Sequence, residues 1–464
     1  MTRIWSRWSR SSSRADPARA AATDAWTRST TTEKLALMDT NTHRGNLPDR
    51  RGTGSLKWDL ARPGEIPLWV ADMDFPVAPA ITAALSRRLA HPIFGYTGVP
   101  RSYREAFCAW QSSRNGWEIS PEQLVILPGV MPAVSLLVEN YTRPGEGVAL
   151  FSPVYYPFFE VVEELGRRVE RIPLAVENGG GDDAVDGAGH DPGHDAAAQA
   201  QGPRHGIDED ALDEALARSR MLLLCSPHNP GGRVWTVEEL SLIARAAERH
   251  RVMVVSDEIH SDLLFPGETF VPWLTLERAG SGHGGHGGHC RDVALLAPSK
   301  TFNIPGLPTA LAVVPDEHHR RDLERVLHAR KQYMSSILAI TAAEAAYTGA
   351  ASWLDETCAT LYRNYLLVRD ALAGEKAAVY RMEGTFIAWI DFRACPGWEE
   401  PAGSSERFDE TARAQGVWLS RGRQFGPQGE GHMRLNFATS PELLREGMVR
   451  LRGALAAFAT GRRG

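Results

Sequence analysis

The stretch Val293–Leu307, VALLAPSKTFNIPGL, decides how the rest of the chain is interpreted. It begins with an apolar run typical of a buried strand, and Lys300 follows this run in a polar turn formed with Pro298, Ser299 and Thr301. A lysine at such a place is either a partner in a structural ion pair or a nucleophile, and most lysines are simply solvated charges. What the remainder of the chain places around Lys300 decides between these interpretations.

The composition is that of an ordinary globular protein. With 464 residues, 43% of them hydrophobic and 23% charged, the chain is long enough for two domains. A net charge of −6 provides no excess of cations for a nucleic-acid backbone, so we expect no nucleic-acid partner. The five cysteines are scattered without CxxC spacing, which favours a reducing, cytoplasmic setting. No apolar run reaches about 18 residues, so we expect no membrane-spanning segment.

Three segments lack the periodic apolar pattern of a packed element. Residues 1–44 are rich in Arg, Ser and Thr, and we predict a disordered tail; a transit peptide, or a start codon set upstream of Met38, would give the same composition. Residues 177–206 and 280–290 are low-complexity insertions. In the second insertion a histidine recurs every third residue, which would also suit a metal site, but a glycine-rich loop cannot hold ligands rigidly. We therefore predict a solvated insertion and no metal.

Short apolar runs alternate with helical patterns through the middle of the chain. The predicted strands are 124–127, 148–151, 221–225, 251–256 and 293–296. The predicted helices include 101–115, ended by Gly116, then 130–141, and one opened by the capping box of Thr236 and Glu239. Continuous apolar strands separated by helices indicate a parallel sheet that is covered on both faces.

The pattern changes after residue 326. Long helices, a few alternating strands and a final helix from Pro441 indicate a smaller α+β domain. We predict a large α/β domain over residues 90–326, a small domain over 327–464, and a segment 45–89 that packs with the small domain.

Three polar side chains follow predicted strands: Asn229 in SPHNPGG, Asp257 in VVSDEIH and Lys300 in APSK. Parallel sheets bind ligands beyond the carboxyl ends of their strands. A desolvated lysine amine is a nucleophile for aldehydes, and a buried carboxylate can hold a pyridine nitrogen protonated. Taken singly, Asp257 could also be a helix cap and Asn229 part of a simple turn. The set, in this order on one sheet, is more specific than any member.

Two further features suit a flat, phosphorylated ligand. The helix that begins at Gly129, Val130 and Met131 offers free backbone NH groups and the positive end of its dipole to a phosphate. Tyr155 could stack on a flat ring or could be an ordinary core aromatic residue.

The motifs resemble those of a known superfamily. SPHNPGGRVWT, VVSDEIHSDL and APSKTFNIPGL resemble the cofactor motifs of fold-type I, pyridoxal-phosphate-dependent, aminotransferase-like enzymes. WVADMDF, FGYTG, SDEIH and HMRLNFA are similar to the carbon–sulfur β-lyase branch of the MalY and PatB type. The resemblance runs from Asp49 to the C terminus, apart from the two insertions. It implies a large domain with a mostly parallel, seven-stranded type of sheet, a smaller α+β domain, pyridoxal 5′-phosphate as cofactor and a homodimer.

The resemblance also implies roles around the cofactor ring. Lys300 would bind the cofactor aldehyde and then act as acid and base at the substrate Cα. Asp257 would pair with the pyridinium, and Tyr155 would stack on the ring. Asn229 and His260 would approach the ring hydroxyl. Plain aminotransferases usually have a tyrosine in place of this histidine, so His260 favours the lyase branch.

The phosphate and substrate ends follow in the same way. Arg434 of HMRLNFA, with Asn229, would bind the substrate α-carboxylate, for which a planar bidentate donor is suited. The chain departs from the family pattern at Ala297, Pro308 and Gly231, where a serine or threonine, a basic residue and a threonine are usual. Fewer side chains would then hold the phosphate. The implied phosphate cup consists of Gly129, Val130, Met131 and Ser299, with Tyr96 from a partner subunit.

The activity implied by the resemblance is that of a cystathionine β-lyase or cysteine-S-conjugate β-lyase. Such an enzyme cleaves L-cystathionine or a related S-substituted cysteine into a thiol, pyruvate and ammonia. An aminotransferase would use the same early steps and is the alternative. A regulatory protein that keeps the fold without turnover is a third interpretation.

Overall fold

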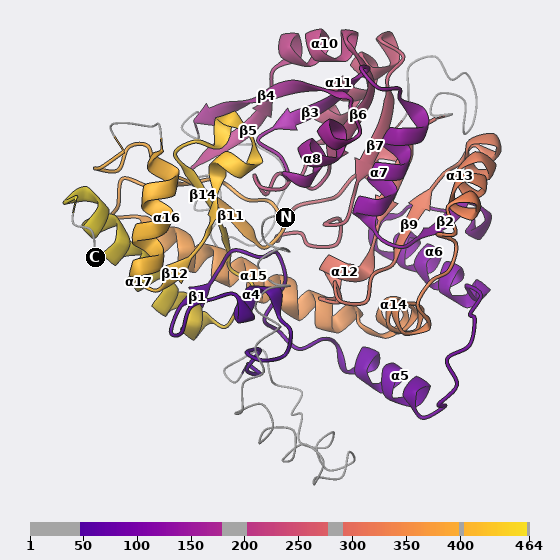
Figure 1. The fold of residues 1–464 in the computed structure, drawn as a ribbon, viewed down its shortest axis with the longest axis horizontal. Helices are drawn as coiled ribbons and strands as arrows, with labels where there is room; N and C mark the ends of the chain where they lie inside the picture. The colour runs from indigo at the N-terminus through magenta and orange to yellow at the C-terminus, as the bar shows by residue number, and fades with distance from the viewer. Residues whose placement is uncertain (1–46, 179–201, 277–290, 399–402, 462–464) are drawn as a thin grey trace, which may run out of the picture.

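The computed structural model describes residues 47–178, 202–276, 291–398 and 403–461 of the chain. An eight-stranded sheet runs through the larger part of the molecule (Figure 1). In spatial order its strands are β2 (Leu124–Leu127), β9 (Ala310–Val313), β8 (Val293–Leu296), β7 (Met253–Asp257), β6 (Ser219–Cys225), β3 (Gly147–Ser152), β4 (Arg168–Asn178) and β5 (Pro203–Ile207). The central strands β8, β7, β6, β3 and β4 are parallel.

Side chains on neighbouring positions of one strand enter different cores. Val148 and Leu150 of β3 pack in one core with α7 (Val130–Tyr141), α8 (Pro157–Glu164) and α13 (Glu317–Ala329). Ala149 and Phe151 pack in another with α10 (Glu209–Ala217) and α11 (Val237–Arg249). Burial on both faces is the reason for the continuous apolar strands, and the predicted two-sided sheet is confirmed.

The edges of the sheet differ from the prediction. β2 was expected to be parallel to its neighbours, but it pairs antiparallel with β9, and β9 pairs antiparallel with β8. Both faces of β2 are buried, so its apolar run is the same for either direction. The low-complexity segment 177–206 is strand at both ends, because β4 and β5 form an antiparallel pair. Residues 179–201 of this segment lie outside the described residues. The predictions for the His-rich segment 280–290 and for the tail 1–44 also fall outside them.

The helix signals in the sequence are confirmed. Helix α6 (Arg101–Asn115) ends at Gly116, whose φ of 60° is a left-handed conformation that glycine adopts without strain. Helix α11 begins with both hydrogen bonds of the predicted capping box. None of the helices in the described ranges has the length and apolar character needed to cross a membrane.

A second, smaller sheet lies beside the large one (Figure 1). Its four antiparallel strands are β10 (Ala378–Val379), β11 (Ile387–Asp391), β14 (His432–Asn436) and β13 (Ser420–Arg421). The helices of this part are α15 (Ala351–Leu372), α16 (Ser404–Ala414) and α17 (Pro441–Ala459).

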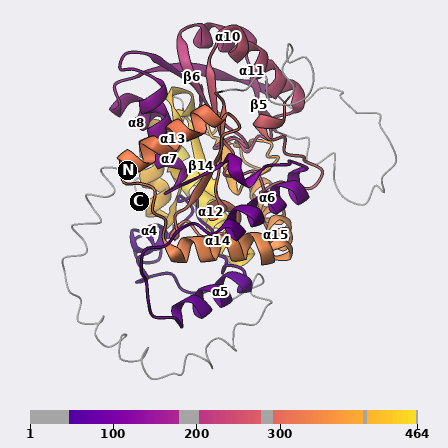
Figure 2. The same ribbon diagram turned by 90° about the vertical axis from the view of Figure 1, so that its right-hand side faces the viewer.

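The N-terminal segment contacts both parts of the molecule. Its strand β1 (Ile66–Pro67) pairs in parallel with β12 (Val417–Trp418) of the small part. Its helix α5 (Pro79–Leu89) packs on α14 (Ile337–Gly349), which also packs on α6 of the large part. Figure 2 shows α5 and α14 together on one side of the molecule. These contacts cross the boundary expected at residue 326.

A buried group of ion pairs holds the WVADMDF segment in place. Lys57 belongs to the short helix α4 (Leu56–Asp59); its ammonium lies 2.9 Å from an Asp74 carboxylate oxygen, and its side chain is fully buried. Arg50 binds Asp72 at 2.7 Å and Asp74 at 2.8 Å. Burial raises the pKa of Asp74, but Lys57, Trp58 and Arg50 together lower it below its usual value.

Replacing Lys57 with Met should lower the free energy of unfolding by about 1.5–3 kcal/mol, because the buried Asp74 carboxylate loses a charged hydrogen-bond donor and keeps only Arg50 and Trp58. Unfolding in urea measures this, and the exposed Arg101→Met variant, which loses the surface pair with Glu105, is the control and should change little. In the wild-type chain the contribution of Asp74 is present above its ordinary pKa of 3.8 and is lost as the pH falls below it. Equal stability of the Lys57 and Arg101 variants would contradict this account.

Candidate active site

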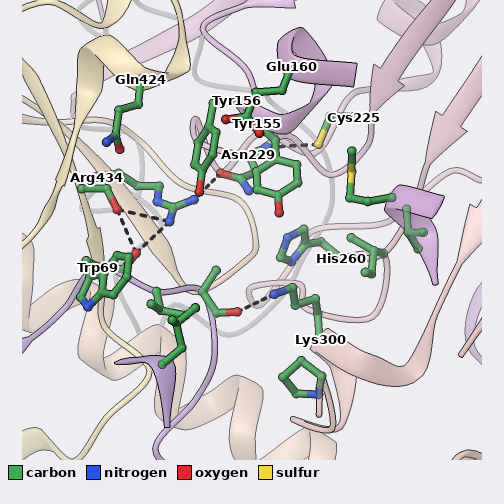
Figure 3. A pocket seen from close by; sticks show the side chains of 18 of the residues that line it. Trp69, Tyr155, Tyr156, Glu160, Cys225, Asn229, His260, Lys300, Gln424 and Arg434 are labelled. Carbon is green, nitrogen blue, oxygen red and sulfur yellow. Dashed lines mark hydrogen bonds between the residues drawn. The ribbon is translucent and has the colours of Figure 1, made fainter. Parts of the chain in front are cut away.

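A cavity of about 730 Å³ lies at the carboxyl ends of the central strands, against the small sheet (Figure 3). Nine of the predicted residues come from the large part of the molecule and one, Arg434, from β14. Tyr96 does not line this cavity, and its side chain is 95% exposed. The predicted residues that do line it are Gly129, Val130, Met131, Tyr155, Asn229, Asp257, His260, Ser299, Lys300 and Arg434.

Lys300 lies in α12 (Pro298–Thr301), a single turn directly after β8. Its amine points into the cavity and donates a 2.5 Å hydrogen bond to the backbone carbonyl of Ala71 (Figure 3). Burial lowers the pKa of Lys300 to about 8; Arg434 also lowers it, while Asp72 and Asp257 oppose the shift. A lysine with this pKa has a substantial neutral fraction near neutral pH, so it suits a nucleophile or a base.

The segment around Ala71 is fixed by two asparagines. The amide of Asn303, just after α12, donates to the carbonyls of Met73 and Phe75 and accepts from the NH of Met73. The amide of Asn436, at the end of β14, donates to the Asp72 carbonyl at 2.7 Å. The carbonyl that accepts from Lys300 is therefore held from both parts of the molecule. Sequence reasoning missed this acceptor, because backbone groups leave no mark in a sequence pattern.

Asp257 and His260 lie at the end of β7. Burial raises the pKa of Asp257 to about 7. A 3.2 Å hydrogen bond from the NH of Ile259 and the nearby charge of Lys300 lower this pKa, but they do not cancel the effect of burial. Burial also lowers the pKa of His260 to about 3, so its ring is neutral. Its Nδ1 has no hydrogen-bond partner among the described residues. A buried carboxyl with a single hydrogen bond and a neutral imidazole whose Nδ1 has no partner in the described part of the chain suit a polar ligand that supplies further partners.

Arg434 connects the two sheets across the cavity. Its guanidinium donates to the side-chain oxygen of Asn229 at 3.2 Å and to the carbonyl of Trp69 at 2.8 Å, with a longer contact of 3.4 Å to Ser420. Burial lowers the pKa of Arg434 to about 10, and its Nε has no partner in the described part of the chain. The sequence indicated Arg434 and Asn229 separately. It did not indicate that they contact each other or that the Trp69 carbonyl accepts a hydrogen bond from Arg434.

Tyr155 contributes an aromatic ring to the same space. Figure 3 shows it close to Asn229 and His260, with its hydroxyl toward the cavity. Burial raises the pKa of Tyr155 above its usual value, so the hydroxyl stays protonated. The ring faces the cavity and not only the core, which suits the stacking role implied by the resemblance.

The N-terminus of α7 forms another end of the cavity. Gly129 precedes the helix and Val130 and Met131 begin it, so their backbone NH groups have no acceptor within the helix. Such a helix end binds anions. Pro308 lines the cavity near Ser299 and offers no donor, as expected from the sequence.

The unusual glycine of NPGG has a steric reason. A Cβ atom at Gly231 would lie 2.5 Å from the His205 ring and 3.1 Å from His228 Nδ1. Both histidines are buried, so a threonine does not fit here without displacing them. Gly231 is therefore a packing adaptation to His205 of β5.

The nearby charges predict how the reactivity of Lys300 responds to mutation. Asp72→Asn removes a carboxylate that favours the ammonium form, so the pKa of Lys300 should fall below about 8. The pH dependence of Lys300 labelling by an amine reagent, followed by peptide mass spectrometry, should move to lower pH. Asp370→Asn, at a side chain that is 70% exposed, is the matched control. A shift to higher pH in Asp72→Asn would contradict the proposed electrostatics.

Comparison with known proteins identifies the family of the chain. The family described as "Aminotransferase class I and II" matches residues 64–451. Cystathionine beta-lyase PatB of Bacillus subtilis is 34% identical over 88% of this chain and 98% of its own length. Protein MalY of Escherichia coli is 32% identical over 88% of this chain and 97% of its own.

A solved structure extends the similarity to the fold. Cystalysin from Treponema denticola, which contains a pyridoxal 5′-phosphate cofactor, has a TM-score of 0.77 with 29% identity, over 89% of this chain and 98% of that one. This confirms the predicted fold-type I transferase architecture. The chain belongs to the aminotransferase class I and II family.

Proposed function

We propose that this protein is a pyridoxal-phosphate-dependent carbon–sulfur β-lyase. It would convert L-cystathionine, or a related S-substituted cysteine, and water into a thiol, pyruvate and ammonia. The observation that carries the proposal is that Lys300, Asp257 and Arg434 meet in one cavity although they come from α12, β7 and β14. Relatives named cystathionine beta-lyase support the substrate class.

The cavity residues fit pyridoxal 5′-phosphate. Lys300 would bind the aldehyde, and Asp257 would hold the ring nitrogen protonated, because a cation beside this buried carboxyl favours its ionised form. The unpartnered Nδ1 of His260 and the amide of Asn229 would approach the ring hydroxyl, and Tyr155 would cover the ring. When bound, the cofactor withdraws electrons from the substrate Cα.

The phosphate would lie at the start of α7. The backbone NH groups of Val130 and Met131, after Gly129, and the hydroxyl of Ser299 are the donors that this chain offers there.

The chain's own residues would carry the substrate steps. The Arg434 guanidinium would bind the α-carboxylate and so turn the Cα–H bond toward Lys300. The substrate amine would first replace the Lys300 amine on the cofactor aldehyde, and the freed, neutral Lys300 amine would then take the Cα proton. The Cβ–S bond would then break with its electron pair leaving on sulfur, and water would release the remaining three-carbon unit as pyruvate and ammonia.

We further propose a homodimer in the cytoplasm. The loop after α5 exposes an apolar run in which Ile93 is 66%, Phe94 55% and Tyr96 95% accessible. Contiguous apolar exposure of this kind marks interaction surfaces, and Tyr96 of one subunit would complete the phosphate site of the other. Every cysteine in the described ranges is a free thiol, which supports a reducing compartment.

Incubation of the purified protein with L-cystathionine should yield equal amounts of pyruvate and thiol. Lys300→Ala should reduce this rate by at least about 10³-fold and should abolish the cofactor absorbance band at about 420 nm. The variant lacks the amine that binds the cofactor aldehyde and removes the substrate Cα proton. Amino transfer to a 2-oxo acid without pyruvate would show an aminotransferase instead. A band that no amino acid alters would indicate a regulatory protein.

Sedimentation of the wild-type chain should give the mass of a dimer. Phe94→Glu should shift it toward the monomer, because a charge in an apolar interface is costly to bury. Val449→Glu changes another exposed apolar residue, 69% accessible on α17, and should leave the dimer intact. A wild-type monomer would refute the proposed assembly.

A further inference from the structure

Asp262 lies outside the cavity lining but touches the turn that carries Lys300. It follows His260 by two residues, in the turn after β7. One of its carboxylate oxygens accepts a 2.8 Å hydrogen bond from the Thr301 hydroxyl. The other accepts a 2.9 Å hydrogen bond from the Trp110 indole of α6. Thr301 is 1% and Trp110 4% accessible, so both donors are fixed by the core.

The placement of this carboxylate matters because two loops must be held at a fixed separation. Strands β7 and β8 are paired up to Asp257 and Leu295, and beyond that point the backbone ladder ends. Asp257 ends β7, His260 lies in the loop that follows this strand, and Lys300 lies in the turn that follows β8. The bond between Asp262 and Thr301 is a side-chain link between these loops beyond the sheet.

The turn that carries Lys300 has little stability of its own. Helix α12 has four residues, and Ala297 at its start provides no side-chain cap. A single helical turn is not stable in isolation, so its position depends on tertiary contacts. The Lys300 amine donates a hydrogen bond to the Ala71 carbonyl, and the hydroxyl of the adjacent Thr301 donates one to the Asp262 carboxylate. The turn is thus held by two neighbouring side chains that bind different partners.

We propose that Asp262 is a positioning residue, whose carboxylate holds Thr301 and thereby fixes the Lys300 amine relative to Asp257 and His260. The catalytic consequence rests on the proposed function, because it requires Lys300 to transfer the Cα proton. Proton transfer is sensitive to small displacements, and a misplacement of about 1 Å can cost about 10²-fold in rate. The geometric consequence concerns the amine alone and holds whatever the substrate.

The chain offers a matched set of variants. Thr301→Val keeps the shape of the side chain but removes the hydroxyl, whereas Thr301→Ser keeps the hydroxyl. Trp110→Phe removes the other donor to Asp262 and leaves Thr301 in place. Asp262→Ala removes the acceptor of both bonds, and Asp262→Asn keeps one acceptor and adds an NH₂ group that can donate to Thr301.

The first measurement is the pH dependence of Lys300 labelling by trinitrobenzenesulfonate in the full-length chain freed of cofactor, read by peptide mass spectrometry. The wild-type midpoint should be about 8. In Thr301→Val and Asp262→Ala it should rise by about one pH unit or more, because the released amine becomes hydrated. The labelling midpoints of Thr301→Ser and Trp110→Phe should equal that of the wild type. The midpoint of Asp262→Asn should lie between those of the wild type and Asp262→Ala.

The second measurement is the kinetics of the holoenzyme with L-cystathionine. Thr301→Val should lower kcat by about 10- to 100-fold with a nearly constant KM, and Thr301→Ser should restore it. Trp110→Phe should lower the unfolding temperature without this loss of kcat. If Asp262→Ala does not fold, the two Thr301 variants still decide the question.

Two results would overturn the proposal. One is a wild-type labelling midpoint in Thr301→Val. The other is an equal shift in Trp110→Phe, since that would show general loosening of the core. A wild-type enzyme that forms no pyruvate would refute the proposed lyase function, while the labelling series would still decide the role of Asp262.

Discussion

Burial of the Lys300 amine is the constraint on which the rest of the site depends. The amine is desolvated because the WVADMDF segment closes one side of the cavity, where the Ala71 carbonyl accepts its hydrogen bond. That segment is in turn held by the partly exposed ion pair of Asp72 with Arg50 and the buried ion pair of Asp74 with Lys57. A reactive lysine thus exists only in the complete fold, since the large sheet alone would leave the amine in water with an ordinary pKa.

A second contact that fixes the site is the hydrogen bond from Arg434 to Asn229, which links the small sheet to the loop after β6. Both residues have a structural partner as well as an implied ligand, so they are held in place before any substrate arrives. The Nε of this guanidinium is buried and has no hydrogen-bond partner within the described ranges of the chain. Preorganisation of this kind lowers the entropic cost of orienting a carboxylate.

Much of this could be predicted from the sequence, for identifiable reasons. Strand ends, the Gly116 helix stop and the Thr236 cap depend on residues close in sequence, and the order of strands in a parallel sheet brings Asn229, Asp257 and Lys300 together. The direction of β2 could not be predicted, because a strand buried on both faces has no directional signal. Asp262 and Thr301 are 39 positions apart in the sequence, and Ala71 and Lys300 are 229 positions apart. Neither contact could be predicted from a local sequence pattern.

The departures from the family pattern now separate into two kinds. Gly231 is explained by the His205 ring, which occupies the space that a threonine would need, so this change follows from packing behind the site. At Ala297 and Pro308 the chain lacks side-chain donors that the family resemblance implies for a phosphate, and Ala297 makes no side-chain cap hydrogen bond to α12. With fewer side chains at that end, binding of the anion would depend on the backbone of α7, whose position is set by the apolar core around Val134 and Leu137. Because α12 has no side-chain cap, the position of the turn that carries Lys300 depends on tertiary contacts such as the hydrogen bond from Thr301 to Asp262.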